Sequence, residues 1–388
     1  LYKYGSASFG TMVDANRWVT MYQNPKLQFV VNQSVWKEGE TTYADVILPA
    51  CTVFERWDIG EWYNVGAGYV HHMFSMNNHR VISLQHKCIE PLGESRSDYD
   101  IFLAISEKLG MGSMYSEGGT TELDWCKRVF DSSDMAKHTT WRKFLKKGYF
   151  VVPSDPATAR APTANRWFYE GRKKDTPEPY PLPSDYKEFG EGLQTASGKF
   201  EFIASTLKKF DDPDRPPLNQ YMPLYEDPKR DPELGEFPLQ LLSPHSRYPF
   251  HLMGDDEGSS LRDIREHRVL KDGHYYLVAR ISRQDAASRG IRDDDLIRLW
   301  NLRGSVVCAA QVTDRLRPGV ISASTDSASY RPMGEPGKST DLGGCVNMLN
   351  SSKSITKKSH GIKPNTTLIQ VEKWTGVDTW KPAEAVNG

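Results

Sequence analysis

The chain has 388 residues, of which 38% are hydrophobic and 26% charged, and its 49 basic residues nearly balance its 50 acidic ones. This composition is typical of a soluble globular protein with two or three domains and excludes a largely disordered chain. The near-neutral charge gives no support to a nucleic-acid-binding function, and no apolar run reaches the roughly 20 residues that span a bilayer.

The first region, residues 1–110, predicts an α/β domain. Residues 27–31 and 44–49 are short apolar runs that predict two buried strands of a parallel sheet. Ser97 can cap a helix whose apolar residues recur at helical spacing until Gly110 ends it. Strands alternating with a helix favour a three-layer arrangement, of which this region would be a part.

The second region, residues 111–234, is less regular. Helices are possible up to about residue 148, whereas residues 153–232 hold more than half of the chain's prolines. Proline interrupts both helices and central strands, so we expect a long connector here. Its many aromatic residues indicate that it packs onto a folded body.

The third region, residues 235–388, predicts mostly β structure. A turn at 301–304 joins two of its apolar runs into a hairpin, and a short helix at 285–290 is stopped by a glycine. Many short strands separated by turns favour a β-barrel. The expected strands cover residues 237–242, 275–281, 296–300, 305–312, 320–323 and 367–371.

The five cysteines are scattered, and none forms a Cys-x-x-Cys pair. This argues against a disulfide framework, a zinc knuckle or an iron–sulfur cluster in this chain. We expect mostly buried thiols and a reducing, cytoplasmic location. The chain begins at Leu1 without an initiator methionine, so we expect a processed start or a piece of a longer protein.

Common catalytic signatures are absent, including the nucleophile elbow, the phosphate loop, the zinc-protease motif and the Rossmann glycine pattern. No catalytic residue is therefore predicted. His71 and His72 form a pair without a third ligand nearby, which favours an exposed polar pair over a metal site.

Residues 243–251 are the most informative segment. Ser243, His245, Arg247 and His251 place a hydroxyl, two imidazoles and a guanidinium directly after an apolar strand, in a loop that two prolines stiffen. Such donors suit a polyanion, for example a pyrophosphate. The alternative is a polar loop that satisfies its own backbone.

Asn32 and Gln33 follow a predicted strand, at the end where α/β sheets bind ligands. Their amides could recognise a purine edge, or they could only end the strand. Arg56 and Asp98 are candidate ligand contacts, with a surface charge and a helix cap as the alternatives.

Two further candidates follow glycines, which allow close approach to a ligand. Asn347 comes after Gly343 and Gly344, and Lys363 comes two residues after Gly361. Each could equally be a feature of a turn.

Taken in order, these segments resemble the molybdopterin oxidoreductases of the dimethyl sulfoxide reductase family. The resemblance covers nearly the whole chain, and it rests on an ordered set of motifs rather than on any single one. The matching segments are residues 30–33, 40–49, 54–56, 91–98, 193–202, 242–245, 285–286, 290–291, 304, 318–319 and 347.

The resemblance implies that the third region is a dinucleotide-binding double-psi β-barrel. It implies molybdenum held by two molybdopterin guanine dinucleotides, with Asn32, Gln33, Arg56 and Asp98 around one guanosine. The loop from Ser243 to His251, including His245 and Arg247, would meet pterin and diphosphate atoms, with His251 as a donor near the pterin. Asn347 and Lys363 would close over a pterin.

Residues 54–58, 85–91 and 334–338 resemble a transhydroxylase group within the family. That implies hydroxyl transfer between trihydroxybenzenes. Alternatives are a member acting on an inorganic oxyanion or a sulfur compound, and a dinucleotide-binding module without catalysis. The family's first two domains, which supply the metal ligand, are not found here, so we expect an incomplete active site. The resemblance also implies an electron-transfer partner subunit that carries the iron–sulfur clusters.

Overall fold

The computed structural model describes residues 1–5, 8–60, 81–151, 201–203, 205–213, 215–222, 225–229, 231–249, 254–255, 258–325, 329–354, 356, 358, 361 and 364–382. Contacts divide the chain into two compact units. The first comprises Leu1–Leu48 and Leu207–Gly388, and the second is Pro49–Thr206. The domain limits expected at residues 110 and 234 stay a prediction, and most of the predicted proline-rich connector lies outside the described residues.

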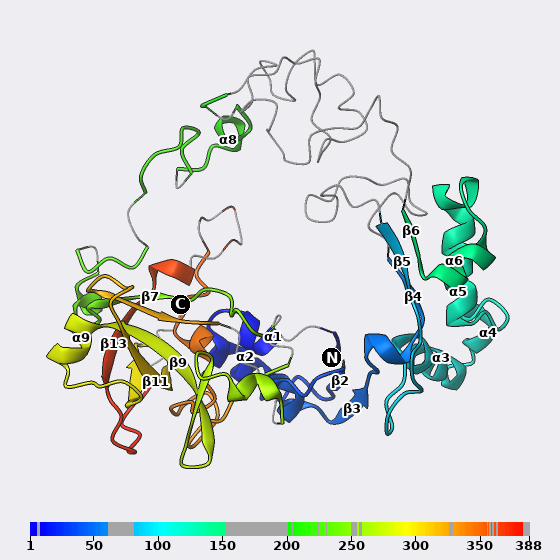
Figure 1. The fold of residues 1–388 in the computed structure, drawn as a ribbon. Helices are drawn as coiled ribbons and strands as arrows, with labels where there is room; N and C mark the ends of the chain where they lie inside the picture. The colour runs from blue at the N-terminus through cyan, green and yellow to red at the C-terminus, as the bar shows by residue number, and fades with distance from the viewer. Residues whose placement is uncertain are drawn as a thin grey trace. The chain divides into compact units, whose positions relative to one another are not determined.

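Six strands of the first unit close into a mixed β-barrel, as the short apolar runs predicted (Figure 1). Neighbouring strands are antiparallel except for β7 with β12 and β9 with β11, and the latter pair closes the barrel. Around the barrel the order is β11 (Ser305–Thr313), β10 (Leu296–Trp300), β13 (Leu368–Lys373), β7 (Leu239–Leu242), β12 (Val320–Ala323) and β9 (His274–Ser282). A further strand, β8 (Arg268–Lys271), pairs antiparallel with β9.

Small and branched apolar side chains pack the barrel on both faces of its strands. In β11, Val306 and Cys308 belong to the main core cluster, whereas Val307 and Ala309 belong to a second cluster with Tyr276. Successive residues of a strand point to opposite faces, so β11 is covered on both sides. This explains why it reads as a continuous apolar run rather than as an alternation.

A small sheet of β1 (Tyr2–Tyr4), β2 (Val31–Ser34) and β3 (Val46–Pro49) belongs to the same unit, in that order. β1 and β2 are parallel, and Tyr2 lies opposite Val31. The strand expected at residues 27–31 is therefore displaced toward the C-terminus, because pairing with β1 decides where it begins. The three-layer arrangement stays a prediction.

Short helices complete the first unit. The α2 residues Ala15, Val19 and Tyr22 share the main core cluster with the barrel strands. Ser282 caps α9, so that helix starts two residues before the expected range. The helices are α1 (Ser8–Thr11), α2 (Ala15–Tyr22), α8 (Ser205–Phe210) and α9 (Arg283–Ser288), with the 3₁₀ turns η1 (Gly39–Tyr43), η5 (Pro232–Glu236), η6 (Ser260–Asp263), η7 (Val346–Met348) and η8 (Pro364–Thr366).

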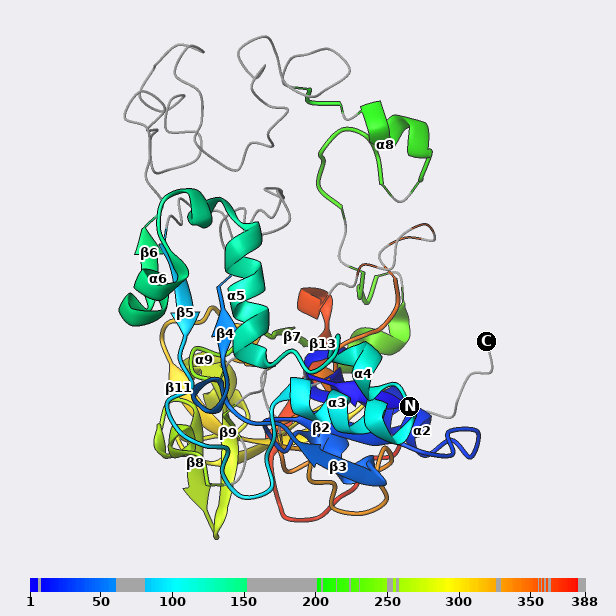
Figure 2. The ribbon, with the colours of Figure 1, turned by 90° about the vertical axis from the view of Figure 1, so that its right-hand side faces the viewer.

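The second unit contains an antiparallel sheet of β4 (Asp58–Ile59), β5 (Val81–Gln85) and β6 (Tyr149–Val151). Helix α5 lies alongside this sheet (Figure 2), and its Phe130 shares a core with Ile82 and Phe144. The expected Ser97 cap is confirmed. The helices are α3 (Asp98–Lys108), α4 (Gly112–Tyr115), α5 (Glu122–Ser132) and α6 (Trp141–Lys147), with the 3₁₀ turns η2 (Val53–Glu55) and η3 (Asp134–Lys137).

All five cysteines are free thiols, and four of them are buried as expected. Cys88 is exposed, because it lies on the loop after β5 rather than in a core. In the part of the chain that the structure describes, no helix combines the length and apolarity needed to cross a membrane.

Candidate functional site

A cavity of about 630 Å³ opens beside the loop that follows β7, and we refer to it as the barrel cavity. His245 and Arg247 of the predicted polyanion-binding loop line it, as do Arg280 of β9 and Arg315 after β11. Its remaining walls are Pro244, Ser246, Tyr248, Glu266, His267, Val278, Gln311, Val312, Thr313, Leu316, Ser322 and Ser324.

The barrel cavity carries surplus positive charge. The hydroxyl of Tyr248 donates to Glu266 at 2.5 Å, and this hydrogen bond lowers the pKa of Glu266. The positive charges of Arg247, Arg280 and Arg315 lower it further. Three guanidinium groups thus act on one carboxylate, which leaves two positive charges for an anionic ligand. Guanidinium groups bind phosphate oxygens with two parallel hydrogen bonds.

Ser243 and Asn347 are brought together by a shared partner, Asn350. The Asn350 amide donates to Ser243 Oγ at 3.1 Å and to Asn347 Oδ1 at 2.8 Å. Asn347 Nδ2 in turn donates to the Gly10 carbonyl at 2.6 Å, which ties α1 to the barrel. Asn347 is 1% exposed and both of its amide atoms are engaged, so it holds the turn around it in place.

We predicted that Asn32 follows a strand, but it is the second residue of β2 and pairs with Lys3, because the strand begins where β1 pairs with it. The Asn32 side chain is 2% exposed, and among the described residues its Nδ2 has no hydrogen-bond partner. The neighbouring Gln33 accepts a hydrogen bond from the Tyr2 hydroxyl. A buried donor without an acceptor is costly, so Asn32 is suited to a ligand that supplies one.

Arg56 and Asp98 both lie in the second unit. Arg56 pairs with Asp58 at 2.7 Å. Burial would lower the pKa of Arg56, but its pKa is raised because the charges of Asp58 and Asp98 outweigh burial. Ser97 rather than Asp98 caps α3, since the Ser97 hydroxyl accepts from the Asp100 N–H at 3.1 Å. Asp98 therefore occupies the first turn with its carboxylate close enough to act on Arg56.

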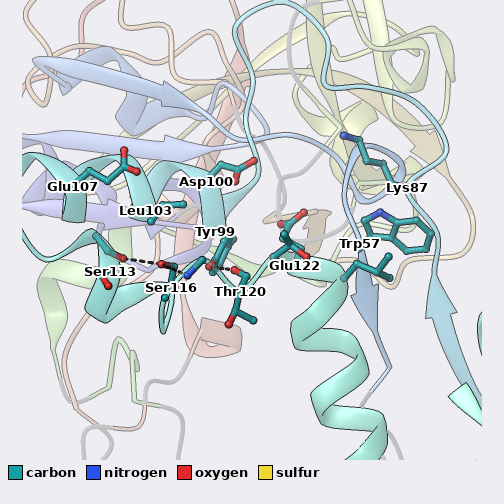
Figure 3. A pocket seen from close by; sticks show the side chains of 15 residues that line it. Trp57, Lys87, Tyr99, Asp100, Leu103, Glu107, Ser113, Ser116, Thr120 and Glu122 are labelled. Carbon is teal, nitrogen blue, oxygen red and sulfur yellow. Dashed lines mark hydrogen bonds between the residues drawn. The ribbon is translucent and has the colours of Figure 1, made fainter.

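A separate cavity of about 610 Å³ lies within the second unit, between α3 and the start of α5 (Figure 3). Its walls include the carboxylates of Asp100, Glu107 and Glu122, opposed by Lys87. The pKa of Glu122 is raised, chiefly by burial and in addition by the negative charge of Asp100, whereas a hydrogen bond from Ser97 lowers it. None of the predicted site residues lines this cavity, and its charge is opposite to that of the barrel cavity.

His251 and Lys363, together with His71 and His72, lie outside the described residues, so their predictions stay untested. Within the described residues, no three His, Cys, Asp or Glu side chains group as a metal site. Sequence reasoning missed Arg280, Arg315 and Asn350. The available signal for Arg280 was its position as a charged residue inside the apolar run 275–281. The available signal for Asn350 was its place three residues after Asn347, which was a predicted site residue.

Comparison with known proteins gives matches along most of the chain. The model of the molybdopterin oxidoreductase family matches residues 1–108, and the model described as the molydopterin dinucleotide binding domain matches residues 239–368. The pyrogallol hydroxytransferase large subunit of Pelobacter acidigallici is 48% identical, over 97% of this chain and 43% of that protein. The dimethyl sulfoxide/trimethylamine N-oxide reductase of Rhodobacter capsulatus is 30% identical, over 97% of this chain and 41% of that protein.

The structure of acetylene hydratase from Pelobacter acetylenicus superimposes with a TM-score of 0.61 at 16% identity, covering 94% of this chain and 42% of that one. The chain thus spans less than half the length of these relatives. Because both family models match in chain order and the hydroxytransferase matches almost throughout, the chain belongs to the molybdopterin oxidoreductase family of enzymes.

Proposed function

We propose that this chain is the cofactor-binding C-terminal part of a molybdenum transhydroxylase that moves a hydroxyl group between trihydroxybenzenes. The observation that carries the proposal is the 48% identity to a pyrogallol hydroxytransferase over 97% of the chain. The reductases named for sulfoxide and N-oxide substrates are only 25–30% identical.

The residues of the chain fit a molybdopterin guanine dinucleotide on two independent observations. The barrel cavity offers Arg247, Arg280 and Arg315 against one carboxylate, which matches the charge of a diphosphate. The unpartnered amide of Asn32 offers a buried donor for a polar ring edge or a ribose oxygen. When bound, the molybdenum of such a cofactor supplies the redox chemistry, and the protein supplies binding, orientation and electrostatics.

Each predicted residue then has a binding role within its own unit. Arg247 and His245 would hold diphosphate or pterin oxygens at the barrel cavity. His251, as a donor near the pterin, and Lys363, which would close over it, lie outside the described residues. Ser243 and Asn347 would keep their loops in place through Asn350. Asn32 and Gln33 would contact a guanosine from the first unit. Arg56 and Asp98, which belong to the second unit, stay predicted ligand contacts.

We further propose that the complete protein works with a second subunit that carries iron–sulfur clusters. The support is that the hydroxytransferase relative is named a large subunit. Subunit composition of the purified complete protein tests this directly: a single polypeptide without iron contradicts it.

The central test is chemical analysis of the complete protein followed by assay. We expect molybdenum, GMP released by acid hydrolysis, and turnover of pyrogallol in the presence of a second polyhydroxybenzene. Turnover of a sulfoxide, N-oxide or inorganic oxyanion in place of pyrogallol would contradict the transhydroxylase assignment. Bound dinucleotide without turnover of any of these would favour a non-catalytic module.

A matched pair of variants tests the barrel cavity itself. Arg280→Gln removes one of the three guanidinium charges, and we expect it to lower GMP content severalfold. Arg283→Gln removes an exposed guanidinium that pairs with Asp314 on the surface, at 2.8 Å, and should leave GMP content unchanged. Equal GMP content in the two variants would show that the cavity does not bind the diphosphate.

A further inference from the structure

We propose that Glu266, His267 and Arg268, together with Asp255, are positioning residues that hold the loop of His245 and Arg247 against the turn that leads to Asn347. The inference rests on the proposed function, because these are the segments through which the barrel would bind the dinucleotide. It assigns a role to two residues of the cavity wall, Glu266 and His267, and to two residues that do not line the cavity, Arg268 and Asp255.

The first connection runs from Tyr248, which belongs to the loop, to the start of β8. The Tyr248 hydroxyl donates to Glu266 at 2.5 Å, and the Tyr248 ring lies 5.7 Å from the His267 ring, centroid to centroid. The Pro244 carbonyl, earlier in the same loop, accepts from the Thr325 N–H at 3.0 Å. The loop is thus attached at both of its described ends.

The second connection runs through Asp255, which follows the loop in the sequence. Its Oδ1 accepts from Arg268 Nε at 2.7 Å and contacts His267 Nε2 at 2.9 Å, and its Oδ2 pairs with the same guanidinium. All three side chains are at most 3% exposed. The Asp255 carboxylate therefore joins His267 and Arg268. The residue before them, Glu266, accepts the hydrogen bond from Tyr248.

The third connection reaches the turn before Asn347. Arg268 Nη1 donates to the Gly343 carbonyl at 3.2 Å and to the Tyr275 carbonyl at 2.9 Å. Asp341 accepts from the Gly343 N–H at 3.0 Å and from the Cys345 N–H at 2.8 Å. The carbonyl and the N–H of Gly343 are thus both hydrogen-bonded, four residues before Asn347.

This arrangement is expected to select one geometry rather than to add much net stability. Burying an ion pair costs desolvation that its attraction only partly offsets, so replacing such a pair by apolar residues is often neutral. A planar guanidinium that bonds a carboxylate and two carbonyls at once defines directions that a lysine ammonium cannot reproduce. Residues that orient metal ligands typically change metal affinity or activity about 10- to 100-fold when substituted, and we take the lower end of that range for residues that orient these loops.

The test uses the complete, cofactor-loaded protein with Arg268→Lys. This variant keeps the positive charge beside Asp255 but loses the planar guanidinium and its fixed donor directions. Arg283→Lys, in the exposed pair with Asp314, is the matched control. Two quantities are measured: GMP per polypeptide after dialysis, and the difference in melting temperature between loaded and cofactor-free protein. We expect about tenfold weaker retention of GMP and a smaller melting-temperature difference for Arg268→Lys, with neither changed in the control.

A merely structural role would lower both melting temperatures equally and leave GMP retention intact, and that result would overturn the inference while leaving the proposed function standing. Wild-type protein without GMP would overturn both. If Arg268→Lys does not fold, Tyr248→Phe removes only the partly exposed hydroxyl that bonds Glu266. It should weaken GMP retention in the same direction, and unchanged retention would also overturn the inference.

Discussion

Replacing Asp255 by asparagine removes the negative charge from a cluster whose carboxylate is fully buried. Burial alone would raise the pKa of Asp255, but the charge of Arg268 and hydrogen bonds from His267 and Arg268 outweigh it and lower the pKa from 3.8 to about 2. A shift of this size corresponds to about 2 kcal/mol of stability. Removing one partner of a buried pair costs about 3–5 kcal/mol, because the other charge stays buried.

We therefore expect Asp255→Asn to lower the free energy of unfolding by about 2–5 kcal/mol at pH 7. Because the folded-state pKa is depressed, this contribution is complete above the unfolded value of 3.8 and is lost as the pH falls toward about 2. Urea unfolding followed by circular dichroism at pH 7, 5 and 3 should show the same difference from wild type at the two higher values and a smaller one at pH 3.

The matched control is Asp314→Asn, which breaks a bidentate pair with Arg283 whose side chains are 69% and 73% exposed. Surface pairs contribute at most about 1 kcal/mol, so this variant should stay close to wild type. The reasoning is refuted if the two variants lose the same stability at pH 7, or if the loss in Asp255→Asn does not diminish at low pH.

Three further substitutions test the packing around the site. Gly344→Ala places a Cβ 2.6 Å from Leu277 Cβ, at a residue whose φ is +90°. The control Gly273→Ala has a φ of +74° and open space around the new Cβ, so it should lower the free energy of unfolding by only about 1–2 kcal/mol. Gly344→Ala should lower it clearly more, and equal shifts in melting temperature would contradict the clash. Asn350→Ala breaks the link between two loops and should lower the free energy of unfolding in urea by about 1–3 kcal/mol; a wild-type midpoint would contradict this. Ser97→Ala removes the cap of α3 and should cost about 1 kcal/mol, measured as a lower melting temperature of the second unit.

The sequence predicted those elements whose signals are local. The hairpin of β10 and β11 follows from two apolar runs joined by a short turn, and the pairing of Trp300 with Ser305 confirms it. Helix α3 follows from the Ser97 cap, helical spacing and a closing glycine, and it forms over Asp98–Lys108. The order of motifs along the chain indicated the family, which the comparisons confirm.

Only the tertiary structure decided which distant segments meet. Barrel closure depends on the parallel pairing of β9 with β11, and β2 begins at Val31 because β1 pairs there. Arg280 and Arg315 lie beside the predicted loop, although they are distant from it in the sequence. Local patterns report the preferences of neighbouring residues, whereas strand partners, buried ion pairs and the charge of a cavity depend on contacts between residues far apart in the chain, which no short window of sequence contains.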